Sequence, residues 1–227
     1  MIRIDVLPDD VLLEIFDFCV GMIPLYEHKM VMEAWQLLVH VCRRWRILVF
    51  ASPRRLNLRL LCTPETPARD TVNIWPALPL LIRGKITSTA GLDNIIIALG
   101  QRNRVCHVNL EGLADRQLES ILAAMQVPFP ELTELTLLSP DEMQPVIPDS
   151  FLGGSAPQLR SFELKGILFP GLAQLLLSAT HLVHLSLINI PHSGYISPEA
   201  MATLLSGLSG LKTLSLVFQL PQARPNW

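Results

Sequence analysis

Six histidines and four cysteines are among the side chains of this sequence able to bind a metal ion or to form a covalent intermediate. The sequence has no H-E-x-x-H, C-x-x-C, G-x-S-x-G, G-x-G-x-x-G or Walker pattern to place them in a known site. His181 and His184 are three residues apart, but only His184 is predicted to lie on a strand. Cys106 and His107 are adjacent, so a strand places them on opposite faces, where the imidazole cannot activate the thiol. We therefore expect no catalytic residue, metal or cofactor.

The cysteines also indicate the compartment. Cys19, Cys42, Cys62 and Cys106 are far apart in the sequence and do not form the framework of a small disulfide-rich domain. The N-terminal region contains Asp5, Asp9 and Asp10 where a secretory signal would need a basic start and an apolar run. We expect reduced cysteines and a protein of the cytoplasm, the nucleus or both.

Composition and charge exclude several classes of function. Half of the 227 residues are hydrophobic and 17% are charged, so the chain must bury extensive apolar surface and is not intrinsically disordered. The net charge of −2 argues against nucleic acid as a partner. Seven arginines do lie between Arg43 and Arg69 against the single acid Glu65, and this run favours either a solvated surface or contact with an acidic protein.

An uncharged stretch of 33 residues, from Gly166 to Pro198, raises the question of a membrane span. A spanning helix needs about 20 mostly apolar residues in succession. Pro170 and Pro191 interrupt this stretch, and polar residues such as His184 recur through it. We therefore expect no membrane-spanning segment.

The first secondary-structure element that the sequence predicts is a helix that begins near Pro8. A proline is well tolerated in the first helical turn, and Asp9 and Asp10 place negative charge against the positive end of the helix dipole. Gly21 and Pro24 end the pattern. Spacings of three and four residues align one apolar face, formed by Leu12, Ile15, Phe16 and Cys19.

A second helical pattern covers residues 28 to 50, and its apolar stripe is formed by Trp35, Leu38, Val39, Cys42, Trp45 and Val49. Leu37, Val41 and Leu48 lie outside that stripe. More than one face is therefore apolar, and we expect part of it to be covered by another element or another chain.

In residue type and order, this region resembles an F-box. The resemblance rests on Leu7-Pro8 before the first helix, on the apolar face of that helix, and on the run Val41-Cys42-Arg43-Arg44-Trp45-Arg46. The segment between them, residues 21 to 34, is longer and less regular than in the family. The resemblance implies docking onto a Skp-family adaptor and, through it, a cullin scaffold. It implies adaptor contacts at Leu7, Pro8, Leu12, Ile15, Phe16, Val41, Cys42 and Trp45; the alternative is that these residues form the core of a helical hairpin.

A repeated template begins at Val105: an apolar residue, two variable residues, an apolar residue, one variable residue and a third apolar residue. Its five instances start at 105, 132, 159, 182 and 211, so they are 27, 27, 23 and 29 residues apart. This spacing is typical of leucine-rich repeats, which stack strands and helices around a shared core. The segment resembles the irregular leucine-rich repeats that follow many F-boxes. The apolar triplets are Val105/Val108/Leu110, Leu132/Leu135/Leu137, Leu159/Phe162/Leu164, Leu182/Leu185/Leu187 and Leu211/Leu214/Leu216.

Helical patterns separate these predicted strands at 115–125, 171–179 and 197–208, while 138–158 is predicted to be irregular. Before the first clear repeat we expect strands at 56–60 and within 75–84, and a helix at 92–99. The predicted organisation is an α/β solenoid with parallel strands on one side and helices on the other. It comprises a helical F-box-like domain (1–50), a linker with possible first irregular repeats (51–104), a leucine-rich repeat array (105–220) and a tail (221–227).

The two-residue alternation of strands predicts which side chains face the open, concave side of the array. The late strands also present Ile188, Val217 and Phe218, and no polar capping repeat follows. This pattern indicates a fragment, a shortened gene product or a chain that dimerises there. The predicted target-binding residues are His107, Asn109, Glu111, Glu134, Thr136, Ser161, Glu163, Lys165, His184, Ser186, Thr213 and Ser215.

Together these two resemblances imply a non-catalytic substrate-recognition subunit of a cullin-RING (SCF-type) E3 ubiquitin ligase. Its F-box would hold the adaptor, and its repeats would bind a target protein whose identity the sequence does not specify. The alternative is an adaptor-independent interaction scaffold, in which a degenerate F-box serves only as a structural cap of the repeats.

Overall fold

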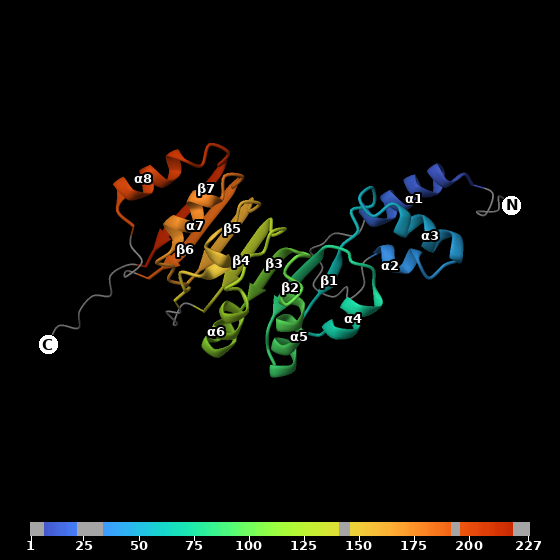
Figure 1. Cartoon of the computed structure of the whole chain (residues 1–227), viewed down its shortest axis with the longest axis horizontal. Coiled ribbons are helices and arrows are strands. Elements are labelled where there is room, and N and C mark those ends of the chain that lie inside the picture. The colour runs from blue at the N-terminus through green and yellow to red at the C-terminus, as the bar shows by residue number, and fades with distance from the viewer. Residues whose placement is uncertain (1–6, 22–33, 141–145, 192–195, 220–227) are drawn as a thin grey trace.

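The computed structural model describes residues 7–21, 34–140, 146–191 and 196–219. These residues form an elongated α/β molecule with a single sheet of seven parallel strands, which is not closed into a barrel (Figure 1). The strands follow one another in chain order across the sheet. They are β1 (Leu60–Cys62), β2 (Leu80–Lys85), β3 (Val105–Glu111), β4 (Glu134–Leu138), β5 (Ser161–Lys165), β6 (His184–Ile190) and β7 (Thr213–Phe218).

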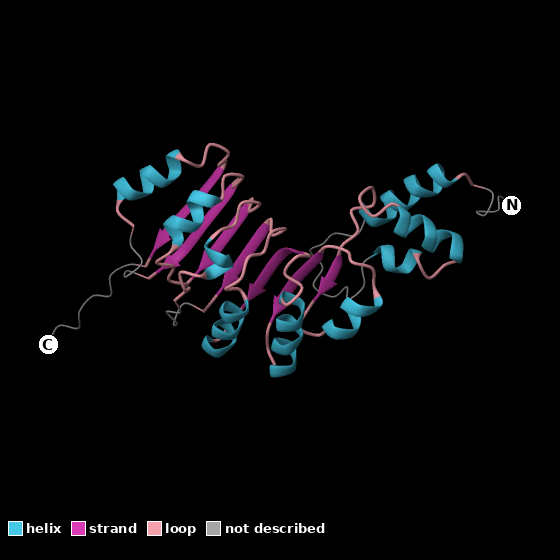
Figure 2. Ribbon diagram, viewed as in Figure 1, coloured by secondary structure: helices cyan, strands magenta, loops and turns pink. Residues whose placement is uncertain are grey.

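Among the described residues, one short helical element lies in each connection between neighbouring strands (Figure 2). Ser88 and Ser197 begin two of these helices in the expected way, since each side-chain oxygen accepts a hydrogen bond from the amide three residues later. The connecting elements are α4 (Ala68–Ile74), α5 (Thr89–Leu99), α6 (Asp115–Ala124), the 3₁₀ turn Phe151–Gly154, α7 (Leu172–Ser178) and α8 (Pro198–Ser206). The helices predicted at 92–99, 115–125, 171–179 and 197–208 are thus confirmed.

The parallel register aligns the apolar positions of β3 to β6 in two rows across the sheet. One row contains Val108, Leu135, Phe162 and Leu185, and the next contains Leu110, Leu137, Leu164 and Leu187. All eight side chains are at most 2% exposed. The second and third apolar positions of the repeated template therefore form the core of these strands, as predicted.

Three N-terminal helices precede the sheet: α1 (Asp9–Gly21), α2 (Ala34–Leu38) and α3 (Arg43–Ala51). We call these three helices the helical unit. Phe16 of α1 packs on Trp45 of α3, with 4.7 Å between ring centroids. Trp35 of α2 packs edge-on against Trp75, and its indole N–H donates a hydrogen bond to the Arg59 carbonyl at 2.8 Å. The helical unit and the sheet consequently share one continuous hydrophobic core.

The single helix predicted over residues 28–50 is wrong. Residues 28–33 lie outside the described residues, and the remainder divides into α2 and α3. Between them the chain turns, and Cys42 is extended, with φ −158° and ψ 170°. The Arg46 side chain donates a hydrogen bond to the Val39 carbonyl, which would be unpaired after the end of α2. The break leaves Val41 and Cys42 exposed at a corner of the helical unit.

The predicted early strands are shifted toward the C-terminus. Leu56 and Leu58 are buried but flank Asn57, whose φ of 46° is incompatible with a strand, so β1 begins only at Leu60. In the second segment Pro76 and Pro79 lack the amide hydrogens that a strand needs, and β2 begins at Leu80. The helix α4 between these strands was not predicted.

Candidate functional site

The first candidate surface is on the helical unit, where α1 has two apolar faces. Leu12 and Phe16 face inward and are fully buried. Val11, Ile15 and Phe18 lie on the other side at spacings of four and three residues, which align them along the helix. Their exposed fractions are 42%, 37% and 67%. We call Val11, Ile15 and Phe18 the outer stripe.

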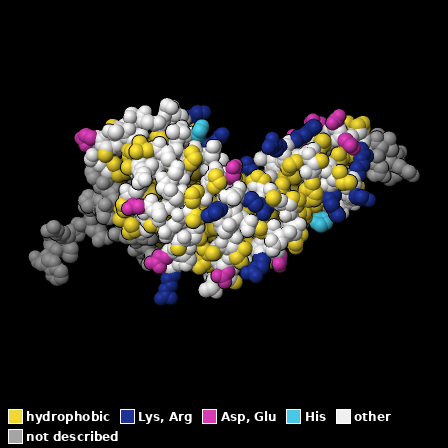
Figure 3. Space-filling model, viewed as in Figure 1, with side chains coloured by type: hydrophobic (Ala, Val, Ile, Leu, Met, Phe, Trp, Pro, Cys, Tyr) yellow, Lys and Arg dark blue, Asp and Glu magenta, His cyan; other side chains and the backbone are white. Residues whose placement is uncertain are grey.

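Three further hydrophobic side chains are exposed nearby in the chain: Leu37 on α2, Val41 before α3 and Ile47 on α3. Each is more than half exposed. Hydrophobic side chains cover much of the face of the helical unit that Figure 3 shows. Exposed apolar groups gathered on one small unit are typical of a protein-binding surface, because single scattered ones are the norm elsewhere.

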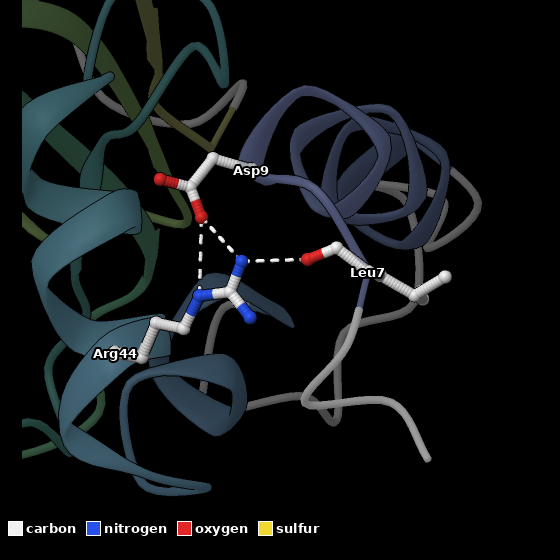
Figure 4. Close-up of polar contacts among 3 residues, drawn as sticks. All are labelled: Leu7, Asp9 and Arg44. Atoms are coloured by element: carbon white, nitrogen blue, oxygen red, sulfur yellow. Dashed lines mark hydrogen bonds and ion pairs between the residues drawn. The ribbon is translucent and has the colours of Figure 1, made fainter. Parts of the chain in front are cut away.

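Arg44 fixes the entry into α1 (Figure 4). Its Nη2 donates hydrogen bonds to the Leu7 carbonyl at 2.6 Å and to Asp9 Oδ1 at 2.5 Å, and its Nε donates to the same carboxylate oxygen at 3.1 Å. A guanidinium presents its donors in a rigid planar fork that can hold several acceptors in fixed positions, whereas lysine has a single ammonium on a flexible chain. Arg44 therefore ties the Leu7-Pro8 segment to the start of α3.

Part of the arginine run thus has a structural role. Besides Arg44, Arg55 forms an ion pair with Glu14 of α1, and Arg46 caps the end of α2 through the Val39 carbonyl. These contacts join the three helices to one another and to the residues that follow them. They support the interpretation of the arginine run as part of this chain's own solvated surface.

The eight residues implied to contact an adaptor differ in exposure. Pro8, Ile15, Val41 and Cys42 are exposed, while Leu7 and Trp45 are half-buried. Leu12 and Phe16 are fully buried against the rest of the chain, so the expectation that they lie at a binding surface is corrected. They are core residues because the chain's own α3, through Trp45, covers their face of α1.

The sequence analysis missed Val11, Phe18 and Ile47 as surface candidates, and it named Leu37 only as part of an apolar face that another element or another chain would cover. The signal for the outer stripe was present, because Val11, Ile15 and Phe18 recur at helical spacing beside the inner face of α1. Spacing alone does not reveal which of two adjacent apolar stripes packs inward. Which stripe packs inward depends on the position of α3. The sequence analysis did not locate the start of α3, because it predicted one longer helix there.

The second candidate surface is the face of the sheet opposite the buried rows, which we call the open face. Its side chains form three rows at right angles to the strands. All twelve predicted target-binding residues lie on it, and each is partly or fully exposed. The rows are His107, Glu134, Ser161, His184 and Thr213; Arg83, Asn109, Thr136, Glu163, Ser186 and Ser215; and Lys85, Glu111, Leu138, Lys165 and Ile188.

Charge on the open face changes from one end to the other. The β2 end presents Arg83 and Lys85, and the middle strands present three acids, Glu111, Glu134 and Glu163. The β7 end has only polar uncharged and apolar side chains on this face. Such a graded surface can select a partner by charge and still bury apolar area.

Glu134 is the best-defined charge on this surface. The Nδ1 atom of His107 lies 3.1 Å from Glu134 Oε2, within hydrogen-bond distance. The hydrogen bond that Glu134 accepts from His107 lowers the pKa of Glu134, and the electrostatic effects of His107, Arg59 and His184 act in the same direction. Partial burial of the carboxylate opposes this effect. Glu134 is therefore held in its ionised form.

Two of the four cysteine thiols lie within the sheet and are largely buried. Burial raises the pKa of the Cys62 thiol to about 11 and also raises the pKa of Cys106, so both thiols stay neutral. Within those residues no cluster of three His, Cys, Asp or Glu side chains could hold a metal ion. His28 and His192 lie outside the described residues.

None of the helices described is both long and apolar enough to span a membrane. In comparisons with known proteins, no family model, curated protein or solved structure matches this chain.

Proposed function

We propose that this protein is a substrate-recognition subunit of a cullin-RING (SCF-type) E3 ubiquitin ligase. The helical unit would dock onto a Skp-family adaptor, and the sheet, in the role of a leucine-rich repeat array, would bind a target protein on its open face. The protein would act in the cytoplasm or the nucleus and would have no catalytic group of its own. Its contribution is to raise the effective concentration of target at the ligase.

The main observation behind this proposal is the outer stripe. Val11, Ile15 and Phe18 are exposed on α1, the helix that follows the F-box-like Leu7-Pro8 start and whose inner face packs on Trp45. An apolar helical stripe left uncovered by its own chain is a suitable anchor for a groove or helix of another protein. Val41 and Cys42, both exposed, lie at the corner between α2 and α3 and extend the set of candidate contacts.

The open face supplies the second binding surface that a receptor needs. It is on the sheet, whereas the adaptor candidates are on the helical unit at the other end of the chain from β7 (Figure 1). Two separate surfaces allow adaptor and target to bind together without competing for the same residues.

An adaptor-independent interaction scaffold is the second candidate. The observation that favours it is the complete burial of Leu12 and Phe16, two of the residues implied to contact the adaptor. In this case the helical unit covers the β1 end of the sheet and protects its core, which is the role of a capping element in a repeat protein.

Co-purification with a Skp-family adaptor tests the proposal. The Ile15→Asp/Phe18→Asp variant should bind the adaptor at least 10-fold more weakly, because both side chains are exposed and their replacement adds charge to the interface. Leu177→Asp is the matched control, since Leu177 is 68% exposed on the distant α7. Wild-type protein that does not bind the adaptor, or a double variant that binds as well as wild type, would favour the scaffold.

Target capture is tested separately on the open face. Glu163→Lys reverses one charge in the middle row and should remove a subset of the proteins captured from a lysate by the intact chain. Asp70→Lys, on α4 and away from the open face, is the control for added charge. An identical set of captured proteins for wild type and Glu163→Lys would contradict a role of the open face in target choice.

A further inference from the structure

Two members of the arginine run, Arg43 and Arg46, are exposed on α3. Arg44 and Arg55 form ion pairs with carboxylates of α1. Within the described residues, neither Arg43 nor Arg46 has such a pair. The surrounding sequence supplies no acid, because residues 34–64 contain six arginines and no Asp or Glu. In this part of the structure the charges of Arg43 and Arg46 are therefore not neutralised by an ion pair.

A large apolar side chain, Ile47, lies on the same side of α3. It follows Arg43 by four residues, and Arg46 follows Arg43 by three, so the three side chains share one face of the helix. Val49 lies on the opposite side and is fully buried, whereas Ile47 is 57% exposed. We call Arg43, Arg46 and Ile47 the basic face. Arginine and exposed apolar groups together are typical of surfaces that bind proteins.

The start of α3 adds to the positive character of this face. The N-cap residue, Cys42, makes no side-chain cap hydrogen bond, and the first turn contains no acid. Arg43 instead places a cation at the positive end of the helix dipole, where a carboxylate is favoured. A negative group supplied by another molecule would offset this unfavourable arrangement. Charge complementarity therefore favours an acidic partner.

We propose that the basic face binds an acidic, amphipathic helical segment of another protein. Arg43 and Ile47 are one helical turn apart, about 6 Å along the axis at roughly 1.5 Å per residue. A partner helix meets both positions when an Asp or Glu lies one turn from a Leu, Ile or Val. The carboxylate accepts charge-assisted hydrogen bonds from the arginines, and the aliphatic side chain covers Ile47.

The chemistry of the basic face favours a protein over other anionic partners. Anionic membranes are recognised by clusters of about four to eight Lys or Arg, and nucleic acid requires a concentrated basic surface. The basic face instead has two arginines beside an aliphatic side chain. It lies on α3 and not on α1, where the outer stripe is found, so the inference goes beyond adaptor docking and does not depend on it.

Fluorescence anisotropy with the full chain and a labelled peptide tests the inference. The probe is a blocked, alanine-based helical peptide of about 15 residues, with glutamates placed one turn from leucines. It should bind wild type, and binding should weaken as NaCl rises from about 20 mM to about 200 mM. A peptide with glutamine in place of each glutamate should bind at least about 10-fold more weakly.

Two variants examine the charge and the apolar contact separately. Arg43→Glu should weaken binding of the glutamate peptide by at least about 10-fold, and it should fold, because an acid is favourable in the first turn of a helix. Ile47→Ala leaves every charge in place and should weaken binding several-fold. Arg69→Glu is the matched control and should bind like wild type, since Arg69 is an exposed arginine in the first turn of α4.

The proposal is overturned if wild type does not bind the glutamate peptide at about 1 mM, or binds the glutamine peptide equally well. Unchanged binding by Ile47→Ala or by folded Arg43→Glu would also overturn it, as would equal weakening by Arg43→Glu and Arg69→Glu. Circular dichroism melting establishes folding; if Arg43→Glu is unfolded, Ile47→Ala and the glutamine peptide decide.

Two further probes address the other classes of anionic partner. Tighter binding, through Arg43, of a short DNA duplex or of phosphatidylserine vesicles than of the glutamate peptide would overturn the proposal and assign the basic face to that class. None of these measurements uses the adaptor, so their outcome is separate from that of the proposed function.

Discussion

Glu134 and His107 lie side by side on neighbouring strands of the open face, with 3.1 Å between the imidazole Nδ1 and the carboxylate. The pair joins β3 to β4 on the side of the sheet that no helix in the described residues covers. It adds to the stability of the sheet and also fixes a negative charge in the middle of the candidate target surface.

This pair predicts a pH-dependent contribution to stability. The hydrogen bond from His107 holds the pKa of Glu134 below its ordinary value, so the stabilisation is present above the unfolded-state pKa. It is lost as pH falls through the lower folded-state pKa. Glu134→Gln should cost less than about 1 kcal/mol at pH 7, because the carboxylate is nearly half exposed, and the cost should disappear in acid.

Urea unfolding of wild type and Glu134→Gln at pH 7 and near pH 3 measures this difference. Glu163→Gln on the adjacent strand is the matched control for loss of a carboxylate from the open face. A cost for Glu134→Gln that stays constant or grows on acidification would show that the ion pair is not its source.

Trp35 predicts how strongly the helical unit is attached to the sheet. Trp35→Phe keeps an aromatic ring beside Trp75 but removes the hydrogen bond to the Arg59 carbonyl. The loss should cost about 1 to 3 kcal/mol, since it leaves a carbonyl without its partner at a site where Trp35 is only 1% exposed. Chemical unfolding measures the change, and Trp75→Phe controls for the smaller ring. If Trp35→Phe and Trp75→Phe lowered the free energy of unfolding equally, packing alone would join the helical unit to the sheet.

Substitutions at Leu135 in the core and at Leu177 on the surface should change the free energy of unfolding by very different amounts. Leu135→Ala removes a fully buried side chain between two neighbouring strands and should destabilise the protein by about 2 to 5 kcal/mol. Leu177→Ala on α7 should change stability by less than about 0.5 kcal/mol, because Leu177 is 68% exposed. Thermal or urea unfolding distinguishes the two. Similar losses would contradict the assignment of the buried rows.

The contacts of Arg44 with Leu7 and Asp9 predict that the position of the start of α1 affects adaptor binding. Arg44→Lys keeps the positive charge but cannot reach both Asp9 and the Leu7 carbonyl with one planar group, so α1 should be less firmly held. We expect a stability loss of about 1 kcal/mol and adaptor binding weakened several-fold, without loss of the fold. Isothermal titration with the adaptor measures the second effect. Arg43→Lys, at an exposed neighbouring position, is the control.

The sequence predicted the repeating part of the fold well, because the Leu135/Leu137 and Leu185/Leu187 pairs alternate at strand spacing and recur at a nearly constant period. The same alternation placed all twelve predicted open-face residues on the correct side. It failed at Leu214, which continues the row of Leu185 but is 40% exposed, because periodicity identifies an apolar face but not how far that face is covered.

The helical unit was less predictable for a different reason. The apolar stripe from Trp35 to Val49 continues across the turn at Val39 to Cys42, so its spacing did not reveal the break. The burial of Leu12 and Phe16 follows from that break, because α3 turns back and packs Trp45 on Phe16. Long-range hydrogen bonds such as the one from Arg46 to Val39 decide such turns, and they leave little trace in the local sequence.

The strict chain order of the seven strands has a consequence for biosynthesis. Each strand pairs with the one made just before it, so a nascent chain leaving the ribosome can add strands one at a time to a surface that is already formed. None of the described strands must wait for a partner distant in the sequence, and the time during which an apolar strand is exposed is short. Only β7 has no successor among the described strands.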